Sequence, residues 1–173
     1  MTAPERLTID VTVARDYVDL CRPRHARALE LFELARQGSI ELSTAPQGYR
    51  LDANGDLAKQ MNATFAIERV ARAPQLAYAS EATFPGDDLM VGAYVPGFAE
   101  AWNAVATSRP PSNKWPPGIP DRFHIETHVL QERDVFLTDD GPLLEMCRRL
   151  HDEHAVNVVA KGLVEYLDSR SSV

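Results

Sequence analysis

The sequence predicts a single α/β domain over residues 1–173, built as three α/β/α layers around a mostly parallel central sheet. Short apolar segments of strand type alternate along the chain with longer segments whose apolar residues recur at helical spacing. This alternation is typical of a parallel sheet with helices on both faces. The length suits one domain with a sizeable core, and there is no internal repeat.

The first half of the chain begins with residues 7–13, where apolar and polar residues alternate as in a strand. Residues 24–37 carry one apolar helical stripe, and Gly38 suits the end of that helix. Residues 40–43 indicate a second short strand. Residues 57–72 indicate another helix, because apolar residues stand four apart there.

The middle of the chain is less regular. Residues 74–97 are rich in proline and glycine and are expected to form a loop with short elements. Residues 98–105 have apolar side chains at i, i+3, i+4 and i+7, which predicts a helix. Residues 109–120 hold five prolines, so we expect a stiff connection rather than a domain boundary. We therefore regard about 57–117 as a variable segment within one domain.

The last third returns to regular alternation. It predicts a helix at 121–132, a strand at 134–138, a helix at 142–154, a strand at 155–160 and a short helix at 162–168. Pro142 suits the first turn of its helix.

Composition limits the classes of function. A formal net charge of −7 argues against a strongly basic nucleic-acid binder. It leaves room for a nucleic-acid enzyme, because a bound divalent cation offsets clustered carboxylates. No apolar run reaches the ~18 residues of a membrane span, and the first residues lack a signal-peptide pattern, so we expect a cytoplasmic protein. Cys21 and Cys147 have no metal-ligand spacing, and apolar neighbours predict that Cys147 is a buried thiol.

Arginines cluster early in the chain, at Arg22, Arg24 and Arg27. The simpler interpretation is a solvated helix face, and binding of phosphate is the alternative.

Four acids fall where the expected elements meet one edge of the sheet. Asp10 is late in the first strand, Asp121 begins a helix, and Asp139 and Asp140 follow a strand. Ligand sites of open α/β sheets occur at this carboxyl edge. Carboxylates gathered there repel one another unless a proton or cation neutralises them, and hard oxygen ligands select Mg²⁺ or Mn²⁺. Asp121 also has a structural explanation as an acid at a helix start, and Asp139 or Asp140 as the cap of the helix that begins at Pro142. Asp10 lacks such an explanation, because an acid inside an apolar strand is costly without a partner.

Competing sites fail on spacing. His124, Glu126 and His128 stand in the order H-I-E-T-H, which turns the glutamate ~100° away from the face that a zinc protease uses. The segment D-A-N-G-D at 52–56 lacks the glycine and closing glutamate of a calcium loop.

The ordered set of motifs resembles the PIN-domain family, compact α/β nucleases. The family opens with a strand carrying Asp followed shortly by Ser, Thr or Asn, matched here by I-D-V-T with Asp10 and Thr12. A helix of the type H-x-x-A-x-x-L-F follows, matched by R-H-A-R-A-L-E-L-F-E-L-A. Later come D-R-F-H at Asp121 and L-T-D-D ending in Asp140. The resemblance covers residues 5–45 and 118–168.

The resemblance implies a Mg²⁺- or Mn²⁺-dependent endoribonuclease that hydrolyses RNA phosphodiesters. Asp10, Asp121 and Asp140 would be its catalytic metal ligands. The supporting residues would be Thr12, Thr138 and Asp139. The family usually has a further acid, most often Glu, after the second strand, and here Asp52 is the nearest candidate.

The alternative within the family is a non-catalytic PIN-like module with a degenerate site that binds RNA or a protein. A small-molecule phosphohydrolase is a third class. The expected partner is RNA, single-stranded or structured, without a membrane; a homodimer, a protein regulator and membership of a toxin–antitoxin pair stay open.

Overall fold

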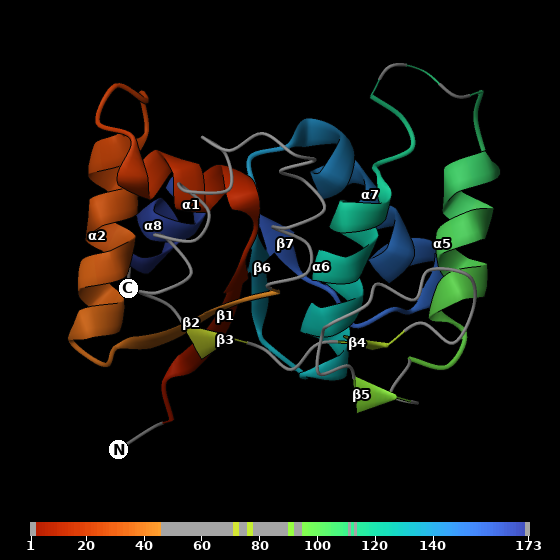
Figure 1. The fold of residues 1–173 in the computed structure, drawn as a ribbon, viewed down its shortest axis with the longest axis horizontal. Coiled ribbons are helices and arrows are strands. Elements are labelled where there is room, and N and C mark those ends of the chain that lie inside the picture. The colour runs from red at the N-terminus through yellow and green to blue at the C-terminus, as the bar shows by residue number, and fades with distance from the viewer. Residues whose placement is uncertain are drawn as a thin grey trace.

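Helices cover both faces of a parallel β-sheet in this protein (Figure 1). The computed structural model describes residues 3–45, 71–72, 76–77, 90–91, 95–110, 112 and 114–171. The helices are α1 (Val11–Val18), α2 (His25–Arg36), α5 (Phe98–Thr107), α6 (Ile119–Leu130), α7 (Gly141–His154) and α8 (Leu163–Ser171). The strands are β1 (Glu5–Ile9), β2 (Ile40–Thr44), β3 (Ala71–Arg72), β4 (Leu76–Ala77), β5 (Met90–Val91), β6 (Val135–Leu137) and β7 (Ala160–Lys161).

The main sheet has the strand order β3-β2-β1-β6-β7, and every neighbouring pair is parallel. The first strand is therefore central, with Leu7 opposite both Leu42 of β2 and Val135 of β6. A second pair, β4 and β5, is also parallel. The α/β class and the parallel sheet expected from the sequence are confirmed.

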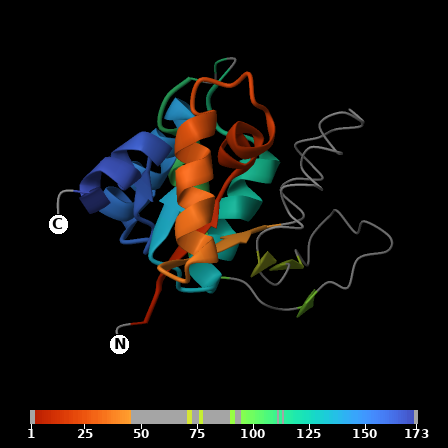
Figure 2. The ribbon, with the colours of Figure 1, turned by 90° about the vertical axis from the view of Figure 1, so that its left-hand side faces the viewer.

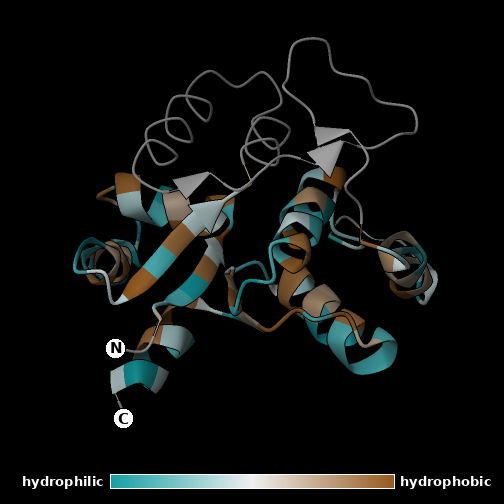
Figure 3. Ribbon diagram, turned by 90° about the horizontal axis from the view of Figure 1, so that it is seen from below, coloured by the Kyte–Doolittle hydropathy of each residue, from teal (hydrophilic) through white to brown (hydrophobic). Residues whose placement is uncertain are grey.

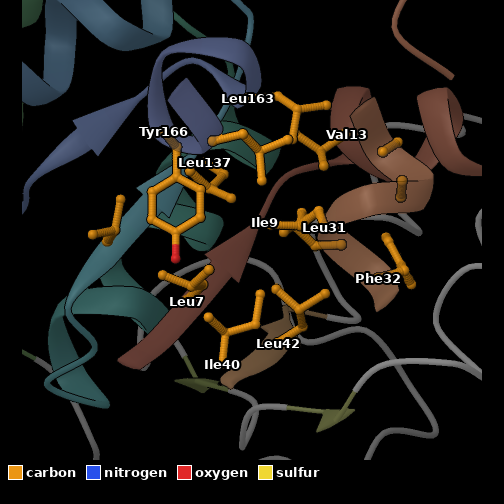
Figure 4. Packing of buried hydrophobic residues seen from close by; sticks show 14 of the residues in the cluster. Leu7, Ile9, Val13, Leu31, Phe32, Ile40, Leu42, Leu137, Leu163 and Tyr166 are labelled. Atoms are coloured by element: carbon orange, nitrogen blue, oxygen red, sulfur yellow. The ribbon is translucent and has the colours of Figure 1, made fainter. Parts of the chain in front are cut away.

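One face of the sheet packs on α1, α2 and α8 (Figure 2). Alternate residues of β1 point to this face, so Leu7 and Ile9 enter the core while Thr8 faces the other way. Tyr166 of α8 and Leu31 of α2 complete the centre of the cluster (Figure 4). Hydrophobic and polar residues accordingly alternate along the strands and around the helices (Figure 3).

The other face packs on α6 and α7, with α5 against α7. The stripe predicted for 98–105 is the buried face of α5. Cys147 lies in this cluster as a buried free thiol, as predicted, together with Phe136 of β6. Among the residues that the structure describes, no helix is long and apolar enough to cross a bilayer.

The strand predicted over 7–13 is wrong in its second half. β1 ends at Ile9 and α1 begins at Val11, so Val11 and Val13 lie in a helix. Asp10 causes the change, because its Oδ1 accepts the backbone N–H of Thr12 at 2.8 Å and of Val13 at 3.2 Å, which caps the new helix. These capping hydrogen bonds favour a helix start at residues whose β-branched side chains favour a strand.

Smaller differences occur elsewhere. The helix expected over 57–72 is wrong at its end, where Ala71–Arg72 is β3, and the rest of that segment lies outside the described residues. The strand expected over 155–160 is confined to β7, although Phe136 donates its backbone N–H to Val159 O at 2.8 Å. The helices predicted near 24–37, 121–132, 142–154 and 162–168 are confirmed within a few residues.

Candidate functional site

The candidate site lies at the carboxyl edge of the sheet, where β1 and β6 end side by side. Asp10 follows β1 directly, and its backbone N–H donates to Leu137 O of β6 at 3.1 Å. Helices α1, α6 and α7 begin at this edge (Figure 1). The parallel pairing thus brings residues 10–12 next to residues 138–140, although about 128 positions separate them in the sequence.

Two threonine hydroxyls tie these segments together. Thr138 donates its hydroxyl to Oδ2 of Asp10 and accepts the backbone N–H of Asp140 at 3.1 Å. Thr12 donates its hydroxyl to Oδ1 of Asp10 at 2.6 Å and accepts the backbone N–H of Asp139 at 3.3 Å. Each threonine thus contacts one acid through its proton and a second acid's backbone through its oxygen. Five of the predicted site residues, Asp10, Thr12, Thr138, Asp139 and Asp140, thus form one hydrogen-bonded network.

Asp10 is the buried centre of that network. Burial raises the pKa of its carboxyl from 3.8 to about 6, while the hydrogen bonds from Thr12, Thr138 and Val13 act in the opposite direction. Desolvation therefore outweighs these favourable hydrogen bonds. A carboxylate in this condition binds a proton or a cation more readily than one exposed to water.

Asp139 and Asp140 face different surroundings. Asp140 is exposed and caps α7, because its Oδ1 accepts the backbone N–H of Leu143 at 3.0 Å. Asp139 is half-buried; its Oδ1 accepts the backbone N–H of Leu163 at 3.3 Å. Burial raises the pKa of Asp139, and the guanidinium of Arg24 opposes that effect. The Nε atom of Arg24 lies 3.1 Å from Asp139 Oδ2 without the alignment of a hydrogen bond, since its N–H is directed at Asp16.

Asp121 lies in the first turn of α6, where its Oδ2 accepts the backbone N–H of Gly118 at 2.8 Å. Asp10 and Asp121 both act electrostatically on the buried thiol of Cys147 and help to raise its pKa, although burial is the larger cause. Asp52, the candidate for a further ligand, lies outside the described residues.

The donor chemistry at this edge fits a hard divalent cation. The polar side chains gathered there are carboxylates and hydroxyls, and a carboxylate that caps a helix keeps further lone pairs for a metal. Within the described residues, however, no three His, Cys, Asp or Glu side chains stand close enough together to hold an ion. The set of Asp10, Asp121 and Asp140 is thus compatible in chemistry but is not drawn together as a closed cage.

Sequence reasoning noted Arg22 and Arg24 but missed Asp16, the acid that they contact. Asp16 of α1 is completely buried, and its two carboxylate oxygens accept from Nε of Arg22 and, at 2.8 Å, from Nε of Arg24. A fully solvated helix face is wrong for these two arginines, because each directs its Nε at the buried Asp16 and only about one third of each side chain is exposed. Once α1 is recognised as a helix, an acid on its buried side followed by R-x-R is the signal that finds this cluster.

His124 and His128 are buried in α6 rather than exposed on it. His128 Nδ1 lies 3.0 Å from Thr8 Oγ1, and its ring meets Phe136 edge-on. Burial lowers the pKa of both histidines to about 4. They are neutral core residues near neutral pH.

No protein-family model matches this chain, and no curated protein matches it.

Proposed function

We propose that the chain is a PIN-like endoribonuclease that depends on Mg²⁺ or Mn²⁺. The observation that carries the proposal is the network in which Thr12 and Thr138 join Asp10 to the backbone of Asp139 and Asp140 at the ends of two central strands. Burying an acid at such an edge lowers the stability of the fold, so a purely structural role does not account for it well. A perturbed carboxylate with specific partners at a ligand-binding edge supports a catalytic role.

The order of elements supports the PIN-like interpretation. The strand with the first acid, the helix with the H-x-x-A pattern, the helix that opens near Asp121 and the strand before Thr138 correspond to β1, α2, α6 and β6. All four contribute to one parallel α/β layer system. These elements follow one another along the chain in the order of the motifs on which the resemblance rests, and this order supports the proposal.

Asp10, Asp121 and Asp140 would hold the ion, with Asp52 as the candidate for a further ligand. When bound, the ion would polarise the phosphate and increase the acidity of water. The hydroxyl of Thr138 keeps Asp10 Oδ2 directed toward β6, and that of Thr12 fixes Oδ1. These contacts hold the buried carboxylate in one orientation, so that the acids need little reorganisation during the reaction.

A direct test is cleavage of a fluorescent single-stranded RNA. We expect cleavage with Mn²⁺, none with EDTA, and a loss of at least about 100-fold in Asp140→Asn, as for removal of a group that stabilises charge in a transition state. Asp134→Asn is the matched control, because Asp134 stands beside the opposite end of β6 and binds the backbone N–H of Arg6 at 2.7 Å. Equal activity in all conditions would refute the metal-nuclease proposal.

The alternative is a non-catalytic PIN-like module that binds RNA or a protein. The lack of a closed group of three ligands within the described residues favours it. The same assay separates the two functions, because a non-catalytic module would leave the RNA at its full length in every metal condition.

A further inference from the structure

The turn between α1 and α2 presents two arginines beside the acidic edge. Arg22 and Arg24 both donate Nε to the buried Asp16, and about one third of each side chain is exposed. The backbone carbonyl of Asp16 also lies 3.0 Å from Nδ1 of His25. Asp16 therefore holds the turn from inside by accepting from both guanidinium groups, and Arg24 also lies beside Asp139.

The position of these charges is unfavourable for the helix that follows them. Arg24 is the N-cap of α2, makes no capping hydrogen bond, and no acid stands in the first turn. The N-terminus of a helix carries partial positive charge and is stabilised by acids, so two arginines there are unfavourable, and the one carboxylate of Asp16 offsets their charge only in part. Departures from local preference of this kind concentrate at functional sites. An anion would satisfy both the guanidinium groups and the helix end.

The remaining donors have a suitable geometry. In both arginines Nε is bound to Asp16, while the Nη atoms make no hydrogen bond in the described part of the chain. A guanidinium whose Nε is held by a carboxylate still presents its Nη–H groups as a planar pair of donors, a geometry that matches two oxygens of a phosphate. Lysine would lack that planar pair. Because the hydrogen bond to Asp16 already restrains each arginine side chain, ordering it on binding costs less conformational entropy.

The cluster adjoins the candidate catalytic acids. Nε of Arg24 lies 3.1 Å from Oδ2 of Asp139, and Arg22 also lowers the pKa of that carboxyl. Asp139 in turn is held by Thr12 of the central network. A phosphate on the outer side of the arginines would therefore be next to a phosphodiester bound at the acids.

We propose that Arg22, Arg24 and the N-terminus of α2 form a phosphate subsite for the backbone of single-stranded RNA, next to the acidic edge and preorganised by Asp16. The subsite rests on the proposed function for its substrate class. It accounts for how a chain with net charge −7 can hold a polyanion at an acidic edge.

The test measures binding apart from cleavage. Anisotropy of a 5′-fluorescein single-stranded RNA is followed in Mg²⁺ over a series of KCl concentrations, with Asp140→Asn as the parent so that the RNA stays intact. Adding Arg24→Gln is expected to weaken binding by about tenfold, as for removal of a charge-assisted hydrogen bond. The slope of log affinity against log salt should become shallower by about 0.7 for each arginine–phosphate ion pair that the substitution removes, and by about twice that in Arg22→Gln/Arg24→Gln.

Arg36→Gln is the matched control, since it removes the same charge from the other end of α2, where Arg36 pairs with Glu33. It should leave the salt slope unchanged. Arg24→Lys covers the case in which the glutamine variants fail to fold: it retains the charge, so the slope should persist while the affinity falls. An unchanged slope in the folded double variant, or a slope change equal to that of Arg36→Gln, overturns the subsite.

The two proposals can fail separately. Cleavage by the wild type with an unchanged slope in the double variant refutes the subsite alone. A shallower slope in the double variant without any Mn²⁺-dependent cleavage refutes the nuclease and keeps the subsite. Absence of RNA binding by the parent overturns the subsite.

Discussion

Asp10 should make the metal-free protein less stable at neutral pH than it would be with a neutral side chain. Its carboxyl is buried at the end of β1, and burial raises its pKa from 3.8 to about 6. Asparagine has nearly the same shape, so Asp10→Asn removes the charge without opening a cavity. The variant isolates the cost of ionising this one group.

The magnitude follows from linkage between protonation and folding. The native state binds the proton more tightly than the unfolded chain, so stability is greatest below about pH 4 and is lost as the pH rises through about 6. The gap between 3.8 and about 6 corresponds to ~3 kcal/mol of destabilisation above pH 6, because each tenfold change in proton affinity is 1.36 kcal/mol. Asparagine keeps the Oδ1 acceptor for Thr12 and Val13 but replaces Oδ2 by a donor toward Thr138, which reduces the gain.

We therefore expect Asp10→Asn to be more stable than the wild type by about 1–3 kcal/mol at pH 8 in EDTA. The difference should shrink at pH 4.5, where the wild-type carboxyl is protonated. Urea unfolding at both pH values measures it, with Asp134→Asn as the control for a carboxylate outside the site. A variant less stable than the wild type by the same amount at both pH values would show that Asp10 acts mainly through its hydrogen bonds and would refute this account.

Three further outcomes are expected. Gly162→Ala would place a Cβ 3.1 Å from Asp139 Oδ1, so RNA cleavage should fall several-fold while Tm, measured by thermal melting, changes by less than about 4 °C. His128→Gln keeps a polar group near Thr8 but removes the titratable ring. Because burial lowers the pKa of His128 to about 4, the wild type should lose stability as the pH falls from 6.5 toward 4. Urea unfolding should show that the variant has a pH slope smaller by up to ~1.4 kcal/mol per pH unit. Arg133→Met should cost about 3 kcal/mol in the same assay, because this buried side chain binds two backbone carbonyls and a carboxylate across β1 and β2.

The sequence predicted the sheet well because strand and helix periods differ clearly in most of the chain. It failed between residues 9 and 13, where the alternation of Ile9, Val11 and Val13 continues into a helix. The same residues fit a helix once Asp10 is taken as its cap, since Val11 and Ala14 then share the buried face. Short windows satisfy both periods, and the capping hydrogen bonds decide between them.

That failure also concealed the link between Asp16 and the arginine cluster. In a strand extending to residue 13, Asp16 has no special place; in α1 it falls on the buried side and needs the two arginines. Sequence reasoning did place Asp10, Asp139 and Asp140 at one edge, because the ends of parallel strands meet there irrespective of side-chain detail. It could not give the threonine hydrogen bonds, which depend on the register between β1 and β6.

The structural and catalytic explanations of the acids are compatible. Asp10 caps α1, Asp140 caps α7 and Asp121 binds the backbone at the start of α6. Each helix of a parallel α/β layer begins at the carboxyl edge of the sheet. Acids that cap these helices therefore lie where a cation would bind. Asparagine caps a helix about as well as aspartate, whereas alanine costs ~1 kcal/mol. Substitution by asparagine therefore removes the charge and keeps the cap, so a loss of cleavage without a loss of stability assigns the carboxylate to catalysis.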